Sequence, residues 1–121
     1  MLENFYILEE INTLGQGKYI CKIHLNASHP IFEGHFPGNP VTPGVCMLQI
    51  IKNISEELLQ KQLFLVKTSN VKFMALIDPN KTPELILDLE IEQQPEHIIV
   101  KNTTSFAGTV ALKLTNTYKL C

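Results

Sequence analysis

The chain has 121 residues, with 10 Lys and Arg residues against 12 Asp and Glu residues and a formal net charge of −2. This length is near a common domain size and predicts one domain over residues 1–121. The charge balance argues against a nucleic-acid partner, which would require a basic surface. A hydrophobic fraction of 45% with 18% charged residues is typical of a folded chain rather than a disordered one.

The first part of the chain predicts two strands joined by a turn. The opening MLENFYILEE has acids at positions 3, 9 and 10, unlike the basic-then-apolar layout of a signal peptide. We expect a strand over residues 5–11, a turn at LGQG (14–17), and a second strand. In that second strand Tyr19, Cys21, Ile23 and Leu25 alternate with more polar residues, which is a half-buried strand pattern.

A proline-rich segment follows and leads into a helix. We expect the helix from about Pro43 to Leu59 or slightly beyond, with Thr42 as its N-cap and Pro43 at its first position, where a missing N–H costs nothing. Its apolar residues fall on one face at helical spacing: Met47, Ile50, Ile51, Ile54 and Leu58.

The second half predicts strands again. Leu85, Leu87, Leu89 and Ile91 alternate with polar or solvent-side residues, and further strands are expected over residues 63–77 (with a break), 97–107 and 109–120. One long helix among antiparallel strands predicts an α+β fold with the helix on one face of a sheet.

The sequence predicts no cofactor site, no metal site and no membrane span. The glycines at 15 and 17 precede a strand, so no phosphate-binding loop is expected, and the four histidines show no ligand spacing. Three widely spaced cysteines form no CxxC pair and favour a reducing, cytoplasmic setting. No apolar run approaches the ~18 residues of a membrane span.

The segment GHFPGNPVTPGVCMLQIIKN, residues 34–53, concentrates backbone constraint around His35. Prolines at 30, 37, 40 and 43 each fix their own φ and bias the preceding residue away from helix, which predicts a pre-shaped irregular loop. At its end Gly44 and Val45 begin the helix, where free N–H groups can donate to a carbonyl oxygen. A histidine base beside such a helix start suits proton abstraction next to a carbonyl, although His35 can also be read as a packing residue at a corner.

The run GHFPGNPVTPGV followed by an apolar helix resembles the signature of the 3-hydroxyacyl-[acyl carrier protein] dehydratases of fatty acid synthesis. The upstream HPIFEGHFPG is similar to relatives found in polyene and pigment pathways. The resemblance implies a hotdog fold, in which an antiparallel sheet wraps around one long central helix and assembles as a homo-oligomer, either a dimer or a trimer of dimers. It implies no cofactor and an acyl carrier protein-linked substrate.

The resemblance also implies roles for particular residues. His35 would abstract the α-proton of the thioester, the Gly44 backbone N–H would hold its carbonyl, and Phe36 and Val45 would line the substrate site. In the family a carboxylic acid 14 residues after the histidine, from the partner protomer, protonates the leaving hydroxyl. That position is Gln49 in this chain.

An amide cannot donate a proton as a carboxylic acid does, so Gln49 is expected to orient the substrate hydroxyl rather than protonate it. A solvated surface glutamine is the other interpretation. Other proton donors stay open: Glu33, Glu56, His24 and His29.

Three functions are compatible with this family resemblance. The preferred one is a dehydratase that converts the 3-hydroxyacyl thioester to a trans-2-enoyl thioester, because the His35 loop is intact. A catalytically deficient thioester-binding subunit of a heterodimer and a hotdog thioesterase are the alternatives.

Overall fold

The computed structural model describes residues 3–34 and 40–121. Within these ranges the chain forms an α-helix, a short 3-10 helix and six strands. The bounds are β1 Tyr6–Gly15, β2 Lys18–Leu25, η1 Pro30–Phe32, α1 Gly44–Leu59, β3 Leu63–Phe73, β4 Glu84–Gln93, β5 Ile98–Phe106 and β6 Thr109–Leu120.

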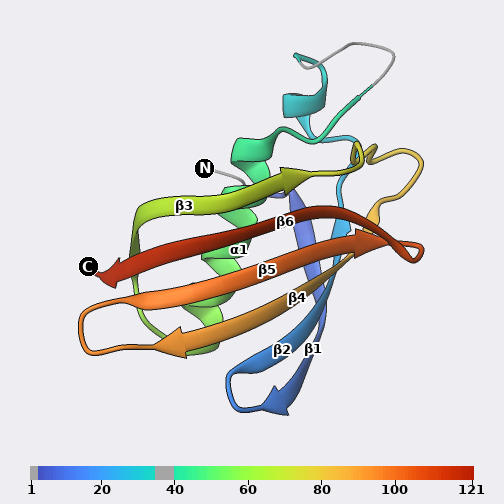
Figure 1. Ribbon diagram of the computed structural model, residues 1–121. Helices are drawn as coiled ribbons and strands as arrows, with labels where there is room; N and C mark the ends of the chain where they lie inside the picture. The colour runs from blue at the N-terminus through green and yellow to red at the C-terminus, as the bar shows by residue number, and fades with distance from the viewer. Residues whose placement is uncertain (1–2, 35–39) are drawn as a thin grey trace.

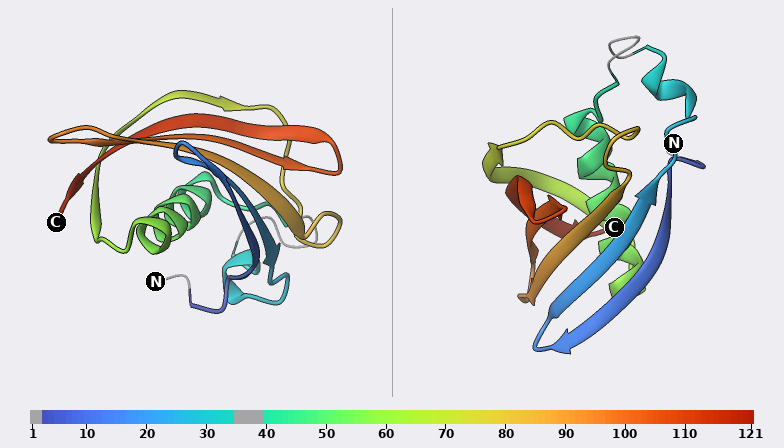
Figure 2. Two further views of the ribbon diagram at one scale, coloured as in Figure 1. Left: turned by 90° about the horizontal axis from the view of Figure 1, so that it is seen from below. Right: turned by 90° about the vertical axis from the view of Figure 1, so that its right-hand side faces the viewer.

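The strands make one antiparallel sheet in the order β1-β2-β4-β5-β6-β3. Figure 1 shows this sheet crossing in front of α1, and the left view of Figure 2 shows it curling around the helix. The predicted α+β architecture, with an antiparallel sheet wrapped around one central helix, is therefore confirmed.

The core lies between the helix and the inner face of the sheet. On the helix Met47, Ile50, Ile51 and Ile54 are fully buried, as the helical spacing of the apolar residues predicts. They meet alternate residues of β2 and β4 whose side chains point inward: Cys21, Ile23, Leu25, Leu85, Leu87 and Leu89. Each such side chain stabilises the fold by about 1.5–3 kcal/mol through burial, so this contact decides where the helix sits.

The start of the helix differs from the prediction. The N-cap is Pro43 (ψ 146°) rather than Thr42, and no side chain caps the helix. The Thr42 N–H instead donates to the Ile77 carbonyl at 2.8 Å, and the Thr42 side chain is only 6% exposed. The Thr42 hydroxyl is buried and makes no capping hydrogen bond to the helix.

Strand limits differ from prediction at two places. β1 continues to Gly15, and β3 stops at Phe73 instead of residue 77. After β3 the chain leaves the ladder: the Met74 and Ala75 N–H groups both donate to the Ala111 carbonyl, at 2.8 and 3.3 Å. The expected break within this stretch appears as two register shifts, at Leu65/Lys67 and Ser69/Lys72. Among the described residues, no helix has the length and apolarity to cross a membrane.

Candidate active site

The helix start provides two free backbone donors. The N–H groups of Gly44 and Val45 donate no hydrogen bond to any described residue, whereas those of Cys46 and Met47 both donate to the Pro43 carbonyl. Both free groups belong to the first turn of a 16-residue helix. There the aligned peptide dipoles favour a partial negative charge, such as a carbonyl oxygen gaining charge.

An apolar cavity of about 480 Å³ opens at this helix start. Its lining comes from two segments, residues 41–44 before the helix and residues 73–77 after β3. A Cβ at Gly44 would lie 2.9 Å from Cζ of Phe73, so the glycine lets the ring lie directly against the backbone. The cavity therefore combines apolar walls with the backbone of Gly44, which suits an acyl thioester.

Thr42 adds a buried polar atom to the same wall. Its Oγ1 has no hydrogen-bond partner among the described residues. A buried hydroxyl left unpaired costs about 1–3 kcal/mol, so this group is a feature that the fold alone does not explain.

Gln49 lies one turn further along the helix and is part-buried. Its Nε2 donates to Oδ1 of Asn53 at 2.8 Å, and Oε1 has no hydrogen-bond partner among the residues that the structure describes. Asn53 also contacts the Tyr6 phenol: burial raises the pKa of Tyr6, the hydrogen bond with Asn53 opposes this rise, and the nearby Glu57 adds to it. Gln49 is thus held in a row of neutral polar groups rather than free in solvent.

Of the other candidate proton donors, His29 and Glu56 make hydrogen bonds that hold the local fold, and Glu33 is exposed. His29 uses both ring nitrogens: Nδ1 accepts from the Ile31 N–H at 3.1 Å, and Nε2 lies 3.0 Å from the Glu3 carbonyl. His29 thereby caps η1 as a neutral imidazole. Glu56 accepts from the Leu63 N–H at 2.8 Å, and so holds the helix end against β3. Glu33 is exposed at the end of η1.

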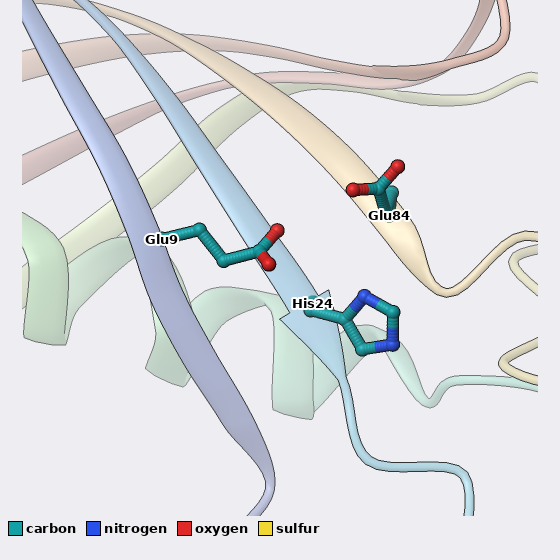
Figure 3. A group of neighbouring side chains, drawn as sticks. All are labelled: Glu9, His24 and Glu84. Carbon is teal, nitrogen blue, oxygen red and sulfur yellow. The ribbon is translucent and has the colours of Figure 1, made fainter.

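His24 lies on the outer side of β2, as its place in the alternating strand predicts. There it meets Glu9 of β1 and Glu84 of β4 (Figure 3). The sequence gives no sign of this group, because its members are 15 and 60 residues from His24 along the chain.

The two remaining predicted site residues, His35 and Phe36, lie outside the described residues. The described chain on either side ends at Gly34 and resumes at Pro40, four residues before the helix start at Gly44.

Solved structures with the same architecture define the chain as a hotdog-fold protein. It is similar to a chain of the dehydratase heterocomplex ApeI:P from Xenorhabdus doucetiae, with a TM-score of 0.72, 21% identity and coverage of 95% of this chain and 96% of that one. It is also similar to a hypothetical thioesterase with coenzyme A from Streptococcus pneumoniae, with a TM-score of 0.69, 15% identity and coverage of 100% and 91%. At these identities the likeness shows the fold.

Sequence comparison places the chain more narrowly. The family model for the ApeI dehydratase, ApeI-like, matches residues 11–111, so the chain belongs to the ApeI-like dehydratase family. It is 28% identical over 118 residues to the 3-hydroxyacyl-[acyl-carrier-protein] dehydratase FabZ of Rickettsia africae, covering 90% of this chain and 77% of that protein. It is 30% identical over 92 residues to FabZ of Zymomonas mobilis, covering 71% and 58%. The predicted dehydratase identity is confirmed.

Proposed function

We propose that this dehydratase acts on 3-hydroxyacyl thioesters carried by acyl carrier protein and releases trans-2-enoyl thioesters, in fatty acid or related polyene or pigment biosynthesis. The names of its FabZ relatives support the substrate class. The observation that carries the proposal is the helix start, where Gly44, whose N–H has no hydrogen-bond partner among the described residues, lines an apolar cavity of about 480 Å³.

In this proposal the Gly44 N–H holds the thioester carbonyl, with Val45 beside it. Removal of the α-proton moves negative charge onto that oxygen, and a fixed donor in an apolar wall stabilises the charge more than water would. Phe36, next to His35 in the sequence, is assigned to the wall around the acyl chain.

His35 is the proposed base. Its assignment comes from the motif, which places it nine residues before Gly44 in a proline-constrained segment. An imidazole titrates near neutral pH, so it can take the α-proton and give it back. As the C–H bond breaks and the double bond forms, the C–O bond to the hydroxyl breaks and the hydroxyl takes up a proton to leave as water.

Gln49 is the proposed orienting group for that hydroxyl. Since its Nε2 is engaged by Asn53, its free Oε1 accepts a hydrogen bond from the substrate O–H and fixes the direction of the leaving oxygen. The amide has no proton to give, so we assign the return of the proton to His35 as well. Loss of a general acid typically costs ~10²–10⁴-fold in rate, which leaves room for slower turnover.

We further propose that the protein assembles as a homodimer through the edge of β3. This edge strand pairs only with β6 among the described strands, and it exposes Phe64, Val66, Val71 and Phe73 by 45–62%. An unpaired apolar edge is a template for a second strand, and two-fold pairing of β3 with its copy would continue the sheet.

Gln49 also favours a second candidate, a subunit that binds thioesters and depends on a different chain for its acid. The free thiols of Cys21, Cys46 and Cys121 support a reducing, cytoplasmic location for either candidate. We propose that residues 1–121 act as one domain in both cases.

The test is an assay of the purified chain alone with 3-hydroxyacyl thioesters of acyl carrier protein and of coenzyme A, following formation of the enoyl thioester. We expect turnover by the wild type and its loss in His35→Ala, with the His97→Ala variant, altered at an exposed histidine before β5, as the matched control. No turnover by the wild-type chain would favour the dependent subunit. Retained turnover in a folded His35→Ala variant would remove His35 from the mechanism.

A further inference from the structure

A second chemical group lies on the outer face of the sheet, away from the cavity at the helix start. It consists of Glu9, His24 and Glu84, one residue each from β1, β2 and β4 (Figure 3). One ligand atom from each side chain lies within 4.8 Å of the other two. None of the three lines the cavity beside Gly44.

Strand pairing and the alternation of side chains along β1 bring these residues together. His24 and Glu84 are direct cross-strand partners in the β2–β4 ladder, so their side chains share one face. The β1–β2 register shifts between Leu8 and Glu10, which makes Glu9 the extra residue of a bulge. Ile7 pairs with His24, so strand alternation places Glu9, two residues further on, on the face that carries His24. The bulge adds Glu10 to this face, because Glu10 pairs with Lys22.

We infer that Glu9, His24 and Glu84 bind a divalent zinc ion. The set of one imidazole nitrogen and two carboxylate oxygens is one that Zn²⁺ accepts, whereas Mg²⁺ and Ca²⁺ prefer oxygen ligands alone. Zn²⁺ ligands lie at ~2.0–2.2 Å from the metal, so the three atoms would draw together by about 1 Å on binding. The two glutamates are exposed and carry flexible side chains, so they can make this adjustment.

Glu9 and Glu84 are exposed, so the remaining coordination position would be open to water. His24 lines a cavity of about 530 Å³ at the end of β2, together with the polar side chains of Asn4, Asn26 and Asn80. Three protein ligands with an open position describe an exchangeable zinc site rather than a closed structural one.

Lys22 is the competing cation at this site. Its Nζ lies 3.3 Å from Oε2 of Glu84, and that contact, with smaller effects from Glu9 and Glu10, raises the pKa of the Lys22 amine. The carboxylates therefore already attract positive charge, and zinc would have to displace the ammonium from Glu84. Lys22 is part-exposed on a flexible stem, so it can move into solvent.

Zinc at this position would tie the edge strand β1 to β4 across β2. A ligand that binds the folded chain and not the unfolded one stabilises the fold in proportion to the logarithm of its free concentration. This inference does not depend on the dehydratase activity, so either can fail without the other.

The experiment is a zinc titration of the full chain against a chromophoric chelator, in a Cys121→Ser background that removes the exposed thiol. We expect one equivalent bound, with affinity lowered ~10-fold or more in His24→Ala, Glu9→Gln and Glu84→Gln. His97→Ala and Glu92→Gln, which alter an exposed histidine and an exposed acid elsewhere, should bind as the background does. Cobalt added in place of zinc should give a visible absorption band that His24→Ala abolishes.

Lys22→Met separates a metal site from an ordinary ion-paired surface. If zinc competes with the ammonium, removing it should tighten zinc binding several-fold, and zinc should raise the Tm of this variant more than that of the background. Zinc binding that is unchanged in His24→Ala, or equally weakened by His97→Ala, would overturn the inference. Unchanged or weaker binding in Lys22→Met would do the same, since it would show that zinc does not occupy the position beside Glu84.

Discussion

The side-chain amide nitrogen of Gln49 already donates a hydrogen bond to Asn53. Gln49 donates to Asn53, and Asn53 contacts Tyr6, so the orientation of the free Oε1 depends on neighbouring side chains of the same protomer. A carboxyl group at this position would keep the acceptor and add a proton that can be transferred.

We therefore expect Gln49→Glu to raise dehydratase turnover by ~10-fold or more, because it supplies a general acid in a part-buried position. The measurement is kcat for enoyl thioester formation, with Gln94→Glu, at an exposed turn, as the control for added charge. An unchanged rate in the folded variant would show that position 49 does not face the substrate. A lower rate would show that the amide makes a contact that the reaction needs.

At Gly44 the important feature is that the residue has no side chain. In Gly44→Ala the new Cβ would meet Cζ of Phe73 at 2.9 Å, and the ring can move because it is 62% exposed. The cost in stability should stay within about 1 kcal/mol. Turnover should fall ~10²-fold, because the methyl group would push the Phe73 ring within the cavity where the thioester carbonyl is proposed to bind.

Kinetics and thermal unfolding measured on the same Gly44→Ala sample separate these effects. Gln93→Ala, at an exposed position at the end of β4, is the control. Equal loss of activity in both variants, or full activity in Gly44→Ala, would contradict the role given to the helix start.

At the scale of elements, β2 carries a pH-sensitive group in its inner face. Burial raises the pKa of the Cys21 thiol to about 11 from an ordinary value of 9.0, and the Glu57 carboxylate adds to the rise. Between these values the unfolded chain loses this proton while the folded chain keeps it. The unfolded state then binds fewer protons, so the free energy of unfolding falls as pH rises from about 9 to 11.

The expected loss from Cys21 is on the order of 2 kcal/mol. Denaturant unfolding under reducing conditions, measured at several pH values, should show it, and Cys21→Ala should make the fall shallower over this range. Burial raises the pKa of Tyr118 to about 12, so part of the decline should persist above pH 10 in that variant. An identical pH profile in both proteins would contradict the assignment to Cys21.

Local sequence patterns predicted which segments form the helix and the strands. They predicted the first and last residues of these elements less accurately. The apolar face of α1 and the alternation in β2 and β4 depend on residues within one turn or one strand, so the sequence shows them directly. Thr42 was wrongly expected to cap the helix because its partner, Ile77, is 35 residues away. The end of β3 at Phe73 likewise depends on contacts with β6.

At the scale of the whole molecule, the order of the strands in the sheet could not be predicted from residue patterns. The neighbours β2 and β4 are separated by α1 and β3 along the chain, and no residue pattern states that they pair. For the same reason the meeting of Glu9, His24 and Glu84 could not be predicted, because it requires the strand order and the register of the pairing together. Gly44 and Gln49 could be placed on the helix, because their spacing follows from the helix itself.

The proposed dimer depends on the exposed edge of β3. We expect Val71→Lys, which places a charge on the exposed β3 edge, to shift the protein from dimer to monomer in sedimentation velocity, because edge lysines oppose strand pairing. Ile7→Lys is the control on the opposite edge, where a side chain 65% exposed on β1 should change nothing. A wild-type chain that sediments as a monomer at micromolar concentration would rule out the proposed interface.

The position of β3 in the sheet has a consequence for how the chain is made. β3 is synthesised directly after the helix, yet its only neighbour among the described strands, β6, is translated about 40 residues later. Until then Phe64, Val66 and the other exposed side chains of β3 have no ladder to join. Meanwhile β4, β5 and β6 form by short-range hairpins, and such local contacts close first. The nascent chain should therefore pass through a stage in which a folded meander coexists with an unattached apolar strand, the interval in which a chaperone would bind this protein.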